Sequence, residues 1–251
     1  MLSKNTLKYI QSLERKKNRL KENLFLAEGK KTILSFLQSD IQVREVFGKK
    51  EWLDQLPVKK GTSYTEISAK ELSTLSKLAN PDEGIALVEI PKNKLEVSEL
   101  KGKHAVYLDR LMDPGNLGTI IRISDWYGIK YIFLSPNCVD PFNAKVIQST
   151  MGSIANVQLH FVNEPDSFFQ EVQALEIPII GTLLEGENMY ESSLPKESLL
   201  IIGNEANGIQ EATKKWIAFP LSIPKFSNSS VESLNAAVCY GIVVSQLVGG
   251  K

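Results

Sequence analysis

Hydrophobic residues recur along this chain with two different periods, and segments of one period alternate with segments of the other. Short, nearly continuous apolar runs, such as 85–90 and 198–202, have the length of buried strands. Other segments repeat at helical spacing, as in 30–38, where Ile33 and Leu37 share a face. Because strands that alternate with helices build parallel sheets covered by helices, the pattern predicts an α/β protein.

The same pattern predicts elements over most of the chain. Ser68, followed three residues later by Glu71, has the spacing of a capping box and predicts a helix start at position 69. The expected strands are 24–29, 41–48, 63–68, 85–90, 104–109, 130–135, 157–162, 178–183 and 198–205, with a short apolar piece at 217–224. The expected helices are one before residue 24, then 30–38, 69–79, 116–127, 143–150, 166–175, 208–216 and 231–247.

One polar segment divides the predicted elements into two groups. Residues 91–103 contain Pro91 and Gly102 and carry little apolar pattern. We therefore predict a first domain over residues 1–92, a linker over 93–103 and a second domain over 104–251.

The composition is that of an ordinary globular protein. The chain has 251 residues, of which 43% are hydrophobic and 23% are charged, and its formal net charge is zero. No apolar run approaches the roughly 18–20 residues that span a bilayer, and the first 24 residues lack the apolar core of a secretory signal. We expect no membrane association.

Cysteine and histidine usage restricts the chemistry further. Cys138 and Cys239 cannot form a disulfide framework, and their apolar surroundings indicate reduced core thiols. With only His104 and His160 and no CxxC pair, we expect no metal site. These features predict a reducing, cytoplasmic location.

Positive charge is concentrated near the amino terminus. Residues 1–31 contain nine bases and three acids, an excess of +6 that the remaining residues balance with −6. A dense basic cluster lies on a helix-like pattern in which Leu13, Leu20 and Leu24 are expected to face inward. Such a cluster attracts polyanions, although a solvated helix face has the same composition. The candidate RNA-binding residues of this cluster are Arg15, Lys16, Lys17 and Arg19.

Three segments that follow predicted strands are rich in Gly, Asn and acidic residues. They are 108–128, 200–209 and 222–238. Ligands of open parallel sheets bind outside the carboxyl ends of the strands, so these segments are the expected place for chemistry. The chain contains no GxxxxGK[ST], GxGxxG, GxSxG or HExxH motif, which disfavours a phosphate-binding P-loop, a dinucleotide site, a serine hydrolase and a zinc protease.

These segments resemble the three motifs of one RNA methyltransferase family. DPGNLGTIIRISD (113–125) resembles motif 1 of the SpoU/TrmH group of the SPOUT superfamily. LLIIGNEANGI (199–209) resembles motif 2, and IPKFSNSSVESLNAAV (223–238) resembles motif 3. RKKNRLKENLFLAEGKK (15–31) and NPDEGIALV (80–88) are similar to the RNA-binding domain that often precedes this catalytic domain, so the resemblance covers nearly the whole chain.

The resemblance implies a fold and an activity. It implies a parallel sheet flanked by helices with a trefoil knot at the carboxyl end, a topology otherwise nearly absent from proteins. A small α/β RNA-binding domain with a ribosomal L30e-like fold is expected before it. The implied cofactor is S-adenosylmethionine, the implied assembly is a homodimer whose active sites are completed across the interface, and the implied reaction is methyl transfer to a ribose 2′-OH of ribosomal RNA or tRNA.

Residue roles follow from the resemblance position by position. The implied catalytic residues are Asn116, Arg122, Glu205, Ser233 and Asn235. The residues that the resemblance implies around the cofactor are Leu183, Gly203, Ile223 and Leu234. Asn116 and Arg122 are six positions apart on the predicted helix, so they do not share one stripe.

The chemistry of the reaction limits what Arg122 can do. A guanidinium stays protonated in proteins and is therefore a poor base. We prefer a role in which Arg122 clamps an RNA phosphate, which places the 2′-OH in line with the methyl group and stabilises charge. An Arg base that depends on the RNA phosphate is the alternative.

Alternative roles remain for several of these residues. Asn116 could cap its helix, Ser233 and Asn235 could cap or pack in the last helix, and Gly203 could be explained by a plain turn. Glu205 could bridge to Arg122 rather than touch the substrate.

The chain also departs from the family pattern. The segment between Lys225 and Glu232 is two residues longer than usual and lacks glycine, which leaves its cofactor contacts open. Gln148 and Ser149 replace a common Arg-Ala pair, which removes one basic residue from a segment that follows a strand.

Two other classes of function remain as alternatives. The chain could be a non-catalytic RNA-binding or assembly factor that retains the fold, although the intact Arg122, Glu205 and Asn235 disfavour this. It could also be a nucleotide-dependent oxidoreductase on a Rossmann sheet. Among RNA substrates, the basic first domain favours ribosomal RNA over tRNA.

Overall fold

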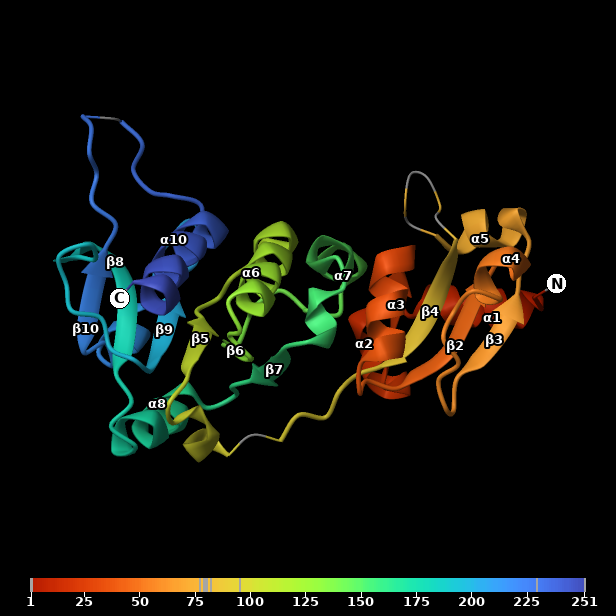
Figure 1. The fold of residues 1–251 in the computed structure, drawn as a ribbon, viewed down its shortest axis with the longest axis horizontal. Helices are drawn as coiled ribbons and strands as arrows, with labels where there is room; N and C mark the ends of the chain where they lie inside the picture. Colours follow the sequence, from red (N-terminus) through yellow and green to blue (C-terminus); the bar gives the residue numbers. More distant parts are fainter. Residues whose placement is uncertain are drawn as a thin grey trace. The chain divides into compact units, whose positions relative to one another are not determined.

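The chain forms two compact units in a computed structural model that describes residues 2–76, 78, 81, 83–94, 96–228 and 230–250 (Figure 1). Unit 1 contains residues 1–92 together with 140–156. Unit 2 contains residues 93–139 together with 157–251. Unit 1 therefore includes a segment that the sequence pattern placed in the second domain.

Unit 1 has a mixed four-stranded sheet in the order β1-β4-β2-β3, in which β2 and β3 are parallel and the other neighbours antiparallel. Its strands are β1 (Leu24–Glu28), β2 (Val43–Gly48), β3 (Ser63–Glu66) and β4 (Gly84–Glu89). Its helices are α1 (Lys4–Ser12), α2 (Lys16–Glu22), α3 (Lys30–Gln38), α4 (Lys50–Leu53), α5 (Ala69–Leu75) and α7 (Ala144–Thr150), with the 3-10 helix η2 (Ser153–Ala155).

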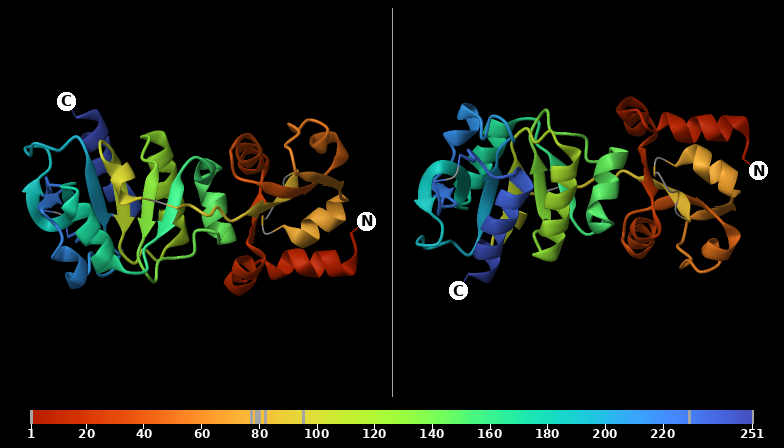
Figure 2. Two further views of the ribbon diagram at one scale, coloured as in Figure 1. Left: turned by 90° about the horizontal axis from the view of Figure 1, so that it is seen from below. Right: turned by 90° about the horizontal axis from the view of Figure 1, so that it is seen from above.

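Helices cover both faces of the unit 1 sheet, as Figure 2 shows. Leu24 and Leu26 of β1 face a core that also contains Ile10 of α1 and Leu72 of α5. Phe25 lies between them in sequence and packs its ring against Phe36 of α3, with the ring centroids 5.5 Å apart. Because alternate side chains of a strand point to opposite faces, a sheet covered on both faces needs apolar residues at every position of its inner strands.

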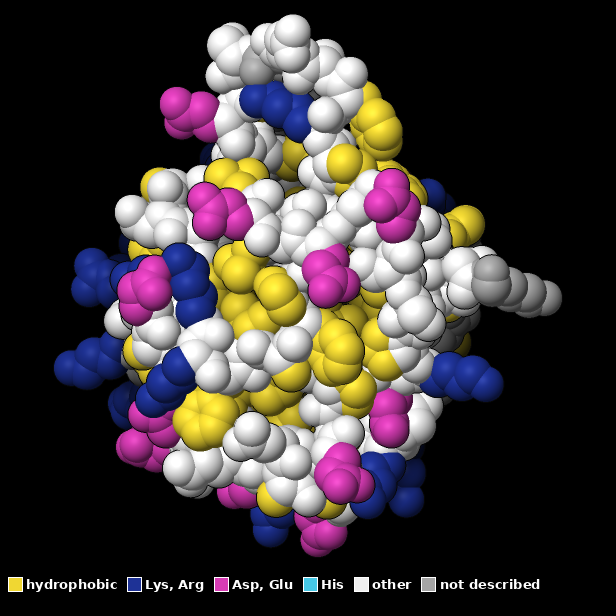
Figure 3. All heavy atoms as spheres, turned by 90° about the vertical axis from the view of Figure 1, so that its left-hand side faces the viewer, with side chains coloured by type: hydrophobic (Ala, Val, Ile, Leu, Met, Phe, Trp, Pro, Cys, Tyr) yellow, Lys and Arg dark blue, Asp and Glu magenta, His cyan; other side chains and the backbone are white. Residues whose placement is uncertain are grey.

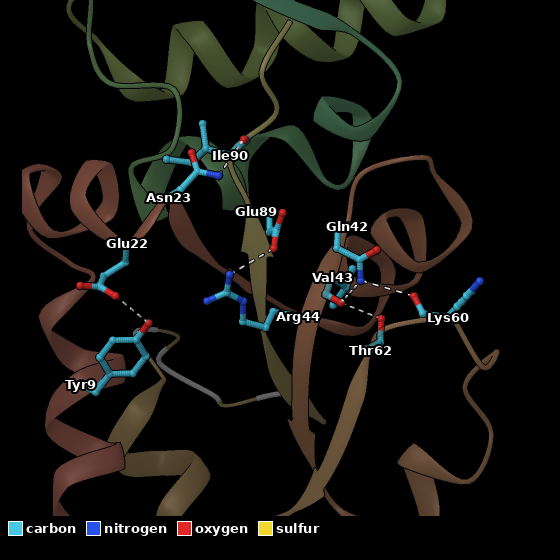
Figure 4. Close-up of polar contacts among 10 residues, drawn as sticks. All are labelled: Tyr9, Glu22, Asn23, Gln42, Val43, Arg44, Lys60, Thr62, Glu89 and Ile90. Atoms are coloured by element: carbon cyan, nitrogen blue, oxygen red, sulfur yellow. Dashed lines mark hydrogen bonds and ion pairs between the residues drawn. The ribbon is translucent and has the colours of Figure 1, made fainter.

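Polar side chains tie the strands of unit 1 to their connecting loops (Figure 4). Arg44 of β2 forms an ion pair with Glu89 of β4 at 3.2 Å. Thr62 donates to the carbonyl of Val43, and Asn23 donates to the carbonyl of Ile90. The capping box predicted at the start of α5 is present, but the helix ends at Leu75; positions 77 and 79 of the expected helix lie outside the described residues.

The segment 140–156 completes the side of unit 1 that carries β1 and α3. The ring of Phe142 lies against Phe25, with centroids 5.0 Å apart. Gly152 approaches Ser35 of α3 so closely that a Cβ would lie 3.0 Å from the Cβ of Ser35. The apolar residues of α7 are thus buried within unit 1, which the pattern of the sequence alone did not indicate.

Arg19 belongs to this buried side rather than to the exposed basic surface. Its side chain is only 4% exposed and forms an ion pair with Asp140. It also donates to the carbonyls of Leu13 and Glu14 at 2.8 and 2.6 Å. The interpretation of Arg19 as an exposed base is therefore wrong, and so is the inward placement of Leu20, which is 63% exposed.

Unit 2 has a six-stranded sheet in the order β10-β8-β9-β5-β6-β7, and all its neighbours are parallel, as predicted. Its strands are β5 (His104–Leu108), β6 (Tyr131–Leu134), β7 (Gln158–Phe161), β8 (Ile179–Asn188), β9 (Ser198–Ile202) and β10 (Phe219–Ser222). Its helices are η1 (Val97–Leu100), α6 (Pro114–Trp126), α8 (Pro165–Ala174), α9 (Glu211–Lys214) and α10 (Ala236–Gly249).

Helices also cover both faces of the unit 2 sheet. One face packs Tyr107 and Ile201 against Phe169 of α8 and Leu100 of η1. On α6 and α10, Ser124 and Tyr240 share a buried hydrogen bond of 2.7 Å. The segment expected to be a linker therefore contributes Leu100 to a core, and position 95 within it lies outside the described residues.

The edge strand β10 and its neighbour β8 expose hydrophobic side chains. Figure 3 shows exposed hydrophobic surface on this side of unit 2, bordered by charged residues. Leu184 of β8 is 80% exposed, and Phe219 of β10 is 46% exposed. Exposed apolar surface of this kind is typical of interaction sites.

None of the described helices is long and apolar enough to cross a membrane. Within the same part of the chain, no group of three or more His, Cys, Asp or Glu side chains could hold a metal ion.

Candidate active site

The loop after β9, at the carboxyl edge of the unit 2 sheet, is held by several hydrogen bonds. The backbone groups of Asn204 and Gly208 form two mutual hydrogen bonds of 2.9 Å. The Asn204 side chain accepts from the amides of Ala206 and Asn207 and donates to the carbonyl of Arg110 at 2.8 Å. A Cβ at Gly203 would lie 2.5 Å from the amide nitrogen of Ile209, so the loop itself requires glycine there.

A buried carboxylate holds the far end of this loop. Asp109 follows β5, is fully buried, and accepts from both the backbone amide and the side-chain amide of Gln210 at 2.8 and 2.6 Å. A buried charge is stable only when its oxygens are hydrogen-bonded, so Asp109 and Gln210 fix each other. Both ends of the loop 203–210 are thereby held to Asp109 and Arg110, the two residues that follow β5.

The start of α6 faces this loop. Asp113 caps the helix by accepting from the amide of Asn116 at 2.7 Å, and Pro114 occupies the first turn. Asn116 is therefore not the cap that its residue type permits. Its side chain is free to make contacts outside the helix.

Asn116, Glu205 and Asn235 form one hydrogen-bonded cluster. The Asn116 Nδ2 donates to Oε1 of Glu205 at 2.8 Å, and the Asn235 Nδ2 donates to Oδ1 of Asn116 at 2.8 Å. The three residues come from α6, the loop after β9 and the residue before α10. Residues far apart in sequence, one from each resembled motif, thus meet at one point.

The hydrogen bonds determine the orientation of both amides. Asn235 is the cap of α10, and its Oδ1 accepts from the amides of Ala237 and Val238, so its Nδ2 points to Asn116. Asn116 must then present Oδ1 to Asn235 and Nδ2 to the carboxylate of Glu205. The arrangement is ordered because each acceptor faces a donor.

Two of the expected catalytic side chains are not part of this cluster. Arg122 is exposed on α6, and its guanidinium has no hydrogen-bond or ion-pair partner among the described residues. Glu205 therefore pairs with Asn116 and not with Arg122. Ser233 is exposed two residues before Asn235 and precedes α10, so it neither caps nor packs within that helix.

The residues expected to enclose the cofactor come from the carboxyl ends of neighbouring strands. Leu183 lies in β8, Gly203 follows β9, and Ile223 follows β10; all three are half-buried. Leu234 is 47% exposed and adjoins Asn235. Aliphatic side chains with adjacent strand-end backbone suit adenosine, because its ring needs apolar contact and its edges need hydrogen-bonding groups. These residues therefore fit S-adenosylmethionine.

Neither thiol near these strands is a reactive nucleophile. Burial raises the pKa of Cys138, whose Sγ donates to the carbonyl of Leu108. Burial also raises the pKa of Cys239 in α10. Both thiols stay protonated near neutral pH, which disfavours a covalent cysteine intermediate.

Comparison with known proteins agrees with the fold. The family model of the SpoU rRNA methylase family matches residues 103–245, and that of the MRM3-like substrate-binding domain matches residues 4–86. The chain belongs to the SpoU rRNA methylase family. It is therefore an RNA methyltransferase, and its cofactor is S-adenosylmethionine.

Several relatives are similar over most of their length. The 23S rRNA (guanosine(2553)-2′-O)-methyltransferase RlmP of Bacillus subtilis is 31% identical over 240 residues, which is 95% of this chain and 94% of the relative. A TrmH-family RNA methyltransferase structure from Porphyromonas gingivalis has a TM-score of 0.93 and 30% identity, with 100% of both chains covered. The AdoMet-bound rRNA methyltransferase of Sinorhizobium meliloti has a TM-score of 0.85 and 26% identity, covering 98% of this chain and 95% of that one.

The sequence did not indicate the residues that hold the loop 203–210 in position. Asp109, Asn204 and Gln210 hold the loop in place, and none of them was a candidate. One signal was present, since an aspartate directly after a buried strand needs a partner. The partner, Gln210, lies 101 positions away and could not be identified from one sequence.

Proposed function

We propose that this protein transfers the methyl group of S-adenosylmethionine to a ribose 2′-OH of 23S ribosomal RNA. The observation that carries the proposal is the cluster of Asn116, Glu205 and Asn235 at the carboxyl edge of the sheet. Support for the substrate comes from the relatives named as 23S rRNA 2′-O-methyltransferases. A cytoplasmic location follows from a ribosomal substrate.

In the proposed reaction, the cluster of Asn116, Glu205 and Asn235 accepts the proton of the ribose hydroxyl. When bound, the sulfonium cofactor supplies an activated methyl group, so the protein contributes mainly positioning. The Glu205 carboxylate is the only member of the cluster that can accept a proton, and Asn116 and Asn235 keep it oriented. The ribose hydroxyl would pass its proton to the Glu205 carboxylate while its oxygen bonds to the methyl carbon, and the bond that would break is the one between that carbon and the sulfur of the donor.

Arg122 is assigned to a site completed by a second copy of the chain. Thr119, Arg122 and Trp126 form an exposed stripe on α6, and Trp126 is 85% exposed. On α10, which packs beside α6, Val238 is 52% exposed. A homodimer through these helices would cover the apolar side chains and place Arg122 where it can clamp an RNA phosphate.

The dimer is tested by the mass of the protein in solution. Trp126→Lys should convert a dimer of about twice the chain mass into a monomer and abolish methyl transfer. A wild-type protein that is monomeric at micromolar concentration would contradict this part of the proposal.

The proposal includes a knotted carboxyl end. The chain leaves the sheet at the edge strand β10, yet Asn235 contacts Asn116 on α6, so the described residues 223–228 and 230–235 belong to a segment that joins the edge of the sheet to α6. We infer that this segment passes through the loop 203–210. An experimental map in which the two segments do not thread would overturn the inference.

Unit 1 is the proposed RNA-binding domain, with an L30e-like fold. The four-stranded sheet with helices on both faces supports that fold. Arg15, Lys16 and Lys17 are exposed at the start of α2, whereas the buried Arg19 no longer belongs to the set. Removing these three charges should weaken RNA binding and reduce its salt dependence, whereas Lys4→Ala, a single exposed base on α1, should have less effect. An unchanged salt slope in the triple variant would contradict the assignment.

The function is tested by methyl transfer to defined RNAs. Purified protein, labelled S-adenosylmethionine and unmodified transcripts of 23S rRNA or bulk tRNA are combined, and incorporated label is counted. We expect label in 23S rRNA. Label only in tRNA would contradict the substrate, and no label in any RNA, including ribosomal subunits, would favour a non-catalytic assembly factor.

A further inference from the structure

Arg110, which lies just after the end of β5 in unit 2, has an unusual backbone conformation. It follows Asp109 and has a φ of +55°, in the left-handed region that residues with long side chains rarely adopt. Its amide donates to Oγ of Ser135, and its carbonyl accepts from the side chain of Asn204, each at 2.8 Å. Two neighbouring loops therefore hold this strained residue in place.

The side chain of Arg110 has a second unusual property. Its Nε is buried and has no hydrogen-bond partner, and no ion pair or hydrogen bond engages the rest of its guanidinium among the described residues. A guanidinium remains charged in proteins, and a buried donor without an acceptor is unfavourable. Strain and an unpaired charge thus occur together in one residue, at the edge of the sheet where the cluster lies.

Arg19 shows what a purely structural arginine looks like in the same chain. Its Nε is likewise buried without a partner, but the other nitrogens bond two carbonyls and the carboxylate of Asp140. The protein thus provides an anion for Arg19 and none for Arg110. Only Nε of Arg110 is buried without a partner, so solvent or an anion from outside the chain can reach its two terminal nitrogens.

We propose that Arg110 binds a phosphate group of the RNA and is a positioning residue for the substrate strand; this rests on the proposed function. A phosphate matches the planar fork of a guanidinium with two parallel hydrogen bonds. Arg110 is joined through Asn204 to the loop that carries Glu205, so a phosphate held there lies beside the cluster. The bound phosphate would fix the register of the ribose relative to Glu205.

The sheet order favours the RNA over the carboxylate of the methyl donor as the anion. The residues that fit the cofactor lie on or after β8, β9 and β10, whereas Arg110 follows β5 and bonds Ser135 after β6. β5 lies on the other side of β9 from β8 and β10. The two ligands would therefore approach the β9 loop from opposite sides.

The left-handed backbone provides a sharp test, because glycine and asparagine suit it better than arginine does. Arg110→Gly and Arg110→Asn should keep or raise the melting temperature. Both should weaken binding of an unmodified 23S rRNA transcript about tenfold and reduce the salt slope by about 1, the effect of one lost phosphate contact. The KM for RNA should rise while the affinity for S-adenosylhomocysteine is unchanged, and Arg110→Lys should recover part of the loss.

Glu176→Gly is the matched control, because Glu176 is exposed and has a φ of +59° after α8. It relieves the same backbone conformation and should not change RNA binding. The proposal is overturned if Arg110→Gly and Arg110→Asn bind the transcript with wild-type affinity and salt slope. It is also overturned if they lose affinity for S-adenosylhomocysteine alone, which would assign the guanidinium to the donor's carboxylate. Failure of the wild type to methylate any RNA would instead count against the proposed function, because RNA binding is measured without catalysis.

Discussion

Two loops at the carboxyl edge of the unit 2 sheet differ in how the chain holds them. The loop 203–210 is tied by mutual backbone bonds, by the Asn204 side chain and by the buried Asp109. The described residues of the segment 223–234, which are 223–228 and 230–234, are mostly exposed; Phe226 is 86% exposed, and its ring lies near that of Tyr190. The first loop is preformed by the protein, whereas the described residues of the second are largely open to solvent.

The difference assigns separate tasks to the two loops. A preformed loop can aim a carboxylate at a reacting group without reorganisation, which is what Glu205 requires. An exposed segment gains partners when a ligand or a second subunit covers it. We therefore expect changes to the backbone of the first loop to affect folding and catalysis together, and changes in the second to affect binding alone.

Gly203→Ala should have the largest effect. The added Cβ would overlap the backbone of Gly208 and Ile209, so the loop must open. We expect a loss of about 1–3 kcal/mol in the free energy of unfolding, as for other overpacked sites, and loss of measurable methyl transfer. Urea unfolding and a methyl-transfer assay check this.

The control is Gly249→Ala, because a Cβ at this position of α10 meets nothing within 4 Å. It should leave both stability and activity near wild type. Wild-type stability in Gly203→Ala would show that the loop is not as constrained as its backbone contacts indicate.

Asn235 separates folding from chemistry. Asn235→Asp keeps an oxygen that caps α10, but it replaces the donor to Asn116 with an acceptor, so the amide of Asn116 must turn away from Glu205. We expect near-normal stability and a fall in kcat of at least tenfold, whereas Asn235→Ala should also lose about 0.5–2 kcal/mol of stability with its cap. Equal activity in Asn235→Asp and wild type would show that the hydrogen bonds of the cluster are not needed for methyl transfer.

Phe226→Ala should test the exposed loop with a smaller effect. Because the side chain is mostly in solvent, the free energy of unfolding should change by no more than about 0.5 kcal/mol. Hydrogen exchange should show that S-adenosylhomocysteine protects amides of 223–234 more than those of 204–209. Greater protection of the amides of 204–209 would contradict the view that the first loop is preformed and the second gains contacts on binding.

Acidification should produce the smallest effect and spare both loops, neither of which contains histidine. Burial lowers the pKa of His160, whose ring on β7 lies near the rings of Tyr131 and Phe133 on the neighbouring strand β6. In the unfolded chain, His160 has the usual histidine pKa of about 6.5 and therefore binds a proton more readily than in the folded protein. The free energy of unfolding should then decrease as the pH falls below that value. Urea unfolding at pH 7.5 and 5.5 should show less pH dependence in His160→Phe than in wild type; an equal dependence would contradict the assignment.

The sequence predicted the parallel sheet and its strands because buried parallel strands are continuous apolar runs. Through the family resemblance, the sequence also indicated Asn116, Glu205 and Asn235 as residues of one active site. It did not predict that α7 is buried in unit 1, because the apolar face of a helix does not say which core it joins. For the same reason Leu20 was expected to face inward, although its side chain is 63% exposed.

Charge was the least predictable property. Arg19 and Lys16 lie in the same basic cluster, yet one is buried against Asp140 and the other is exposed. The distinction depends on a carboxylate 121 positions away. Arg110 was not a candidate either, because its importance rests on a backbone angle and an unpaired nitrogen that no single sequence displays.

The most direct test of the account is the position of the methyl group in the product. Unmodified 23S rRNA is incubated with the protein and S-adenosylmethionine carrying a deuterated methyl group, then digested to nucleosides for mass spectrometry. The account predicts deuterium in one 2′-O-methylnucleoside, and its loss in Glu205→Ala and Asn116→Ala variants that fold normally. Deuterium on a base, or unchanged 2′-O-methylation in both variants, would contradict it.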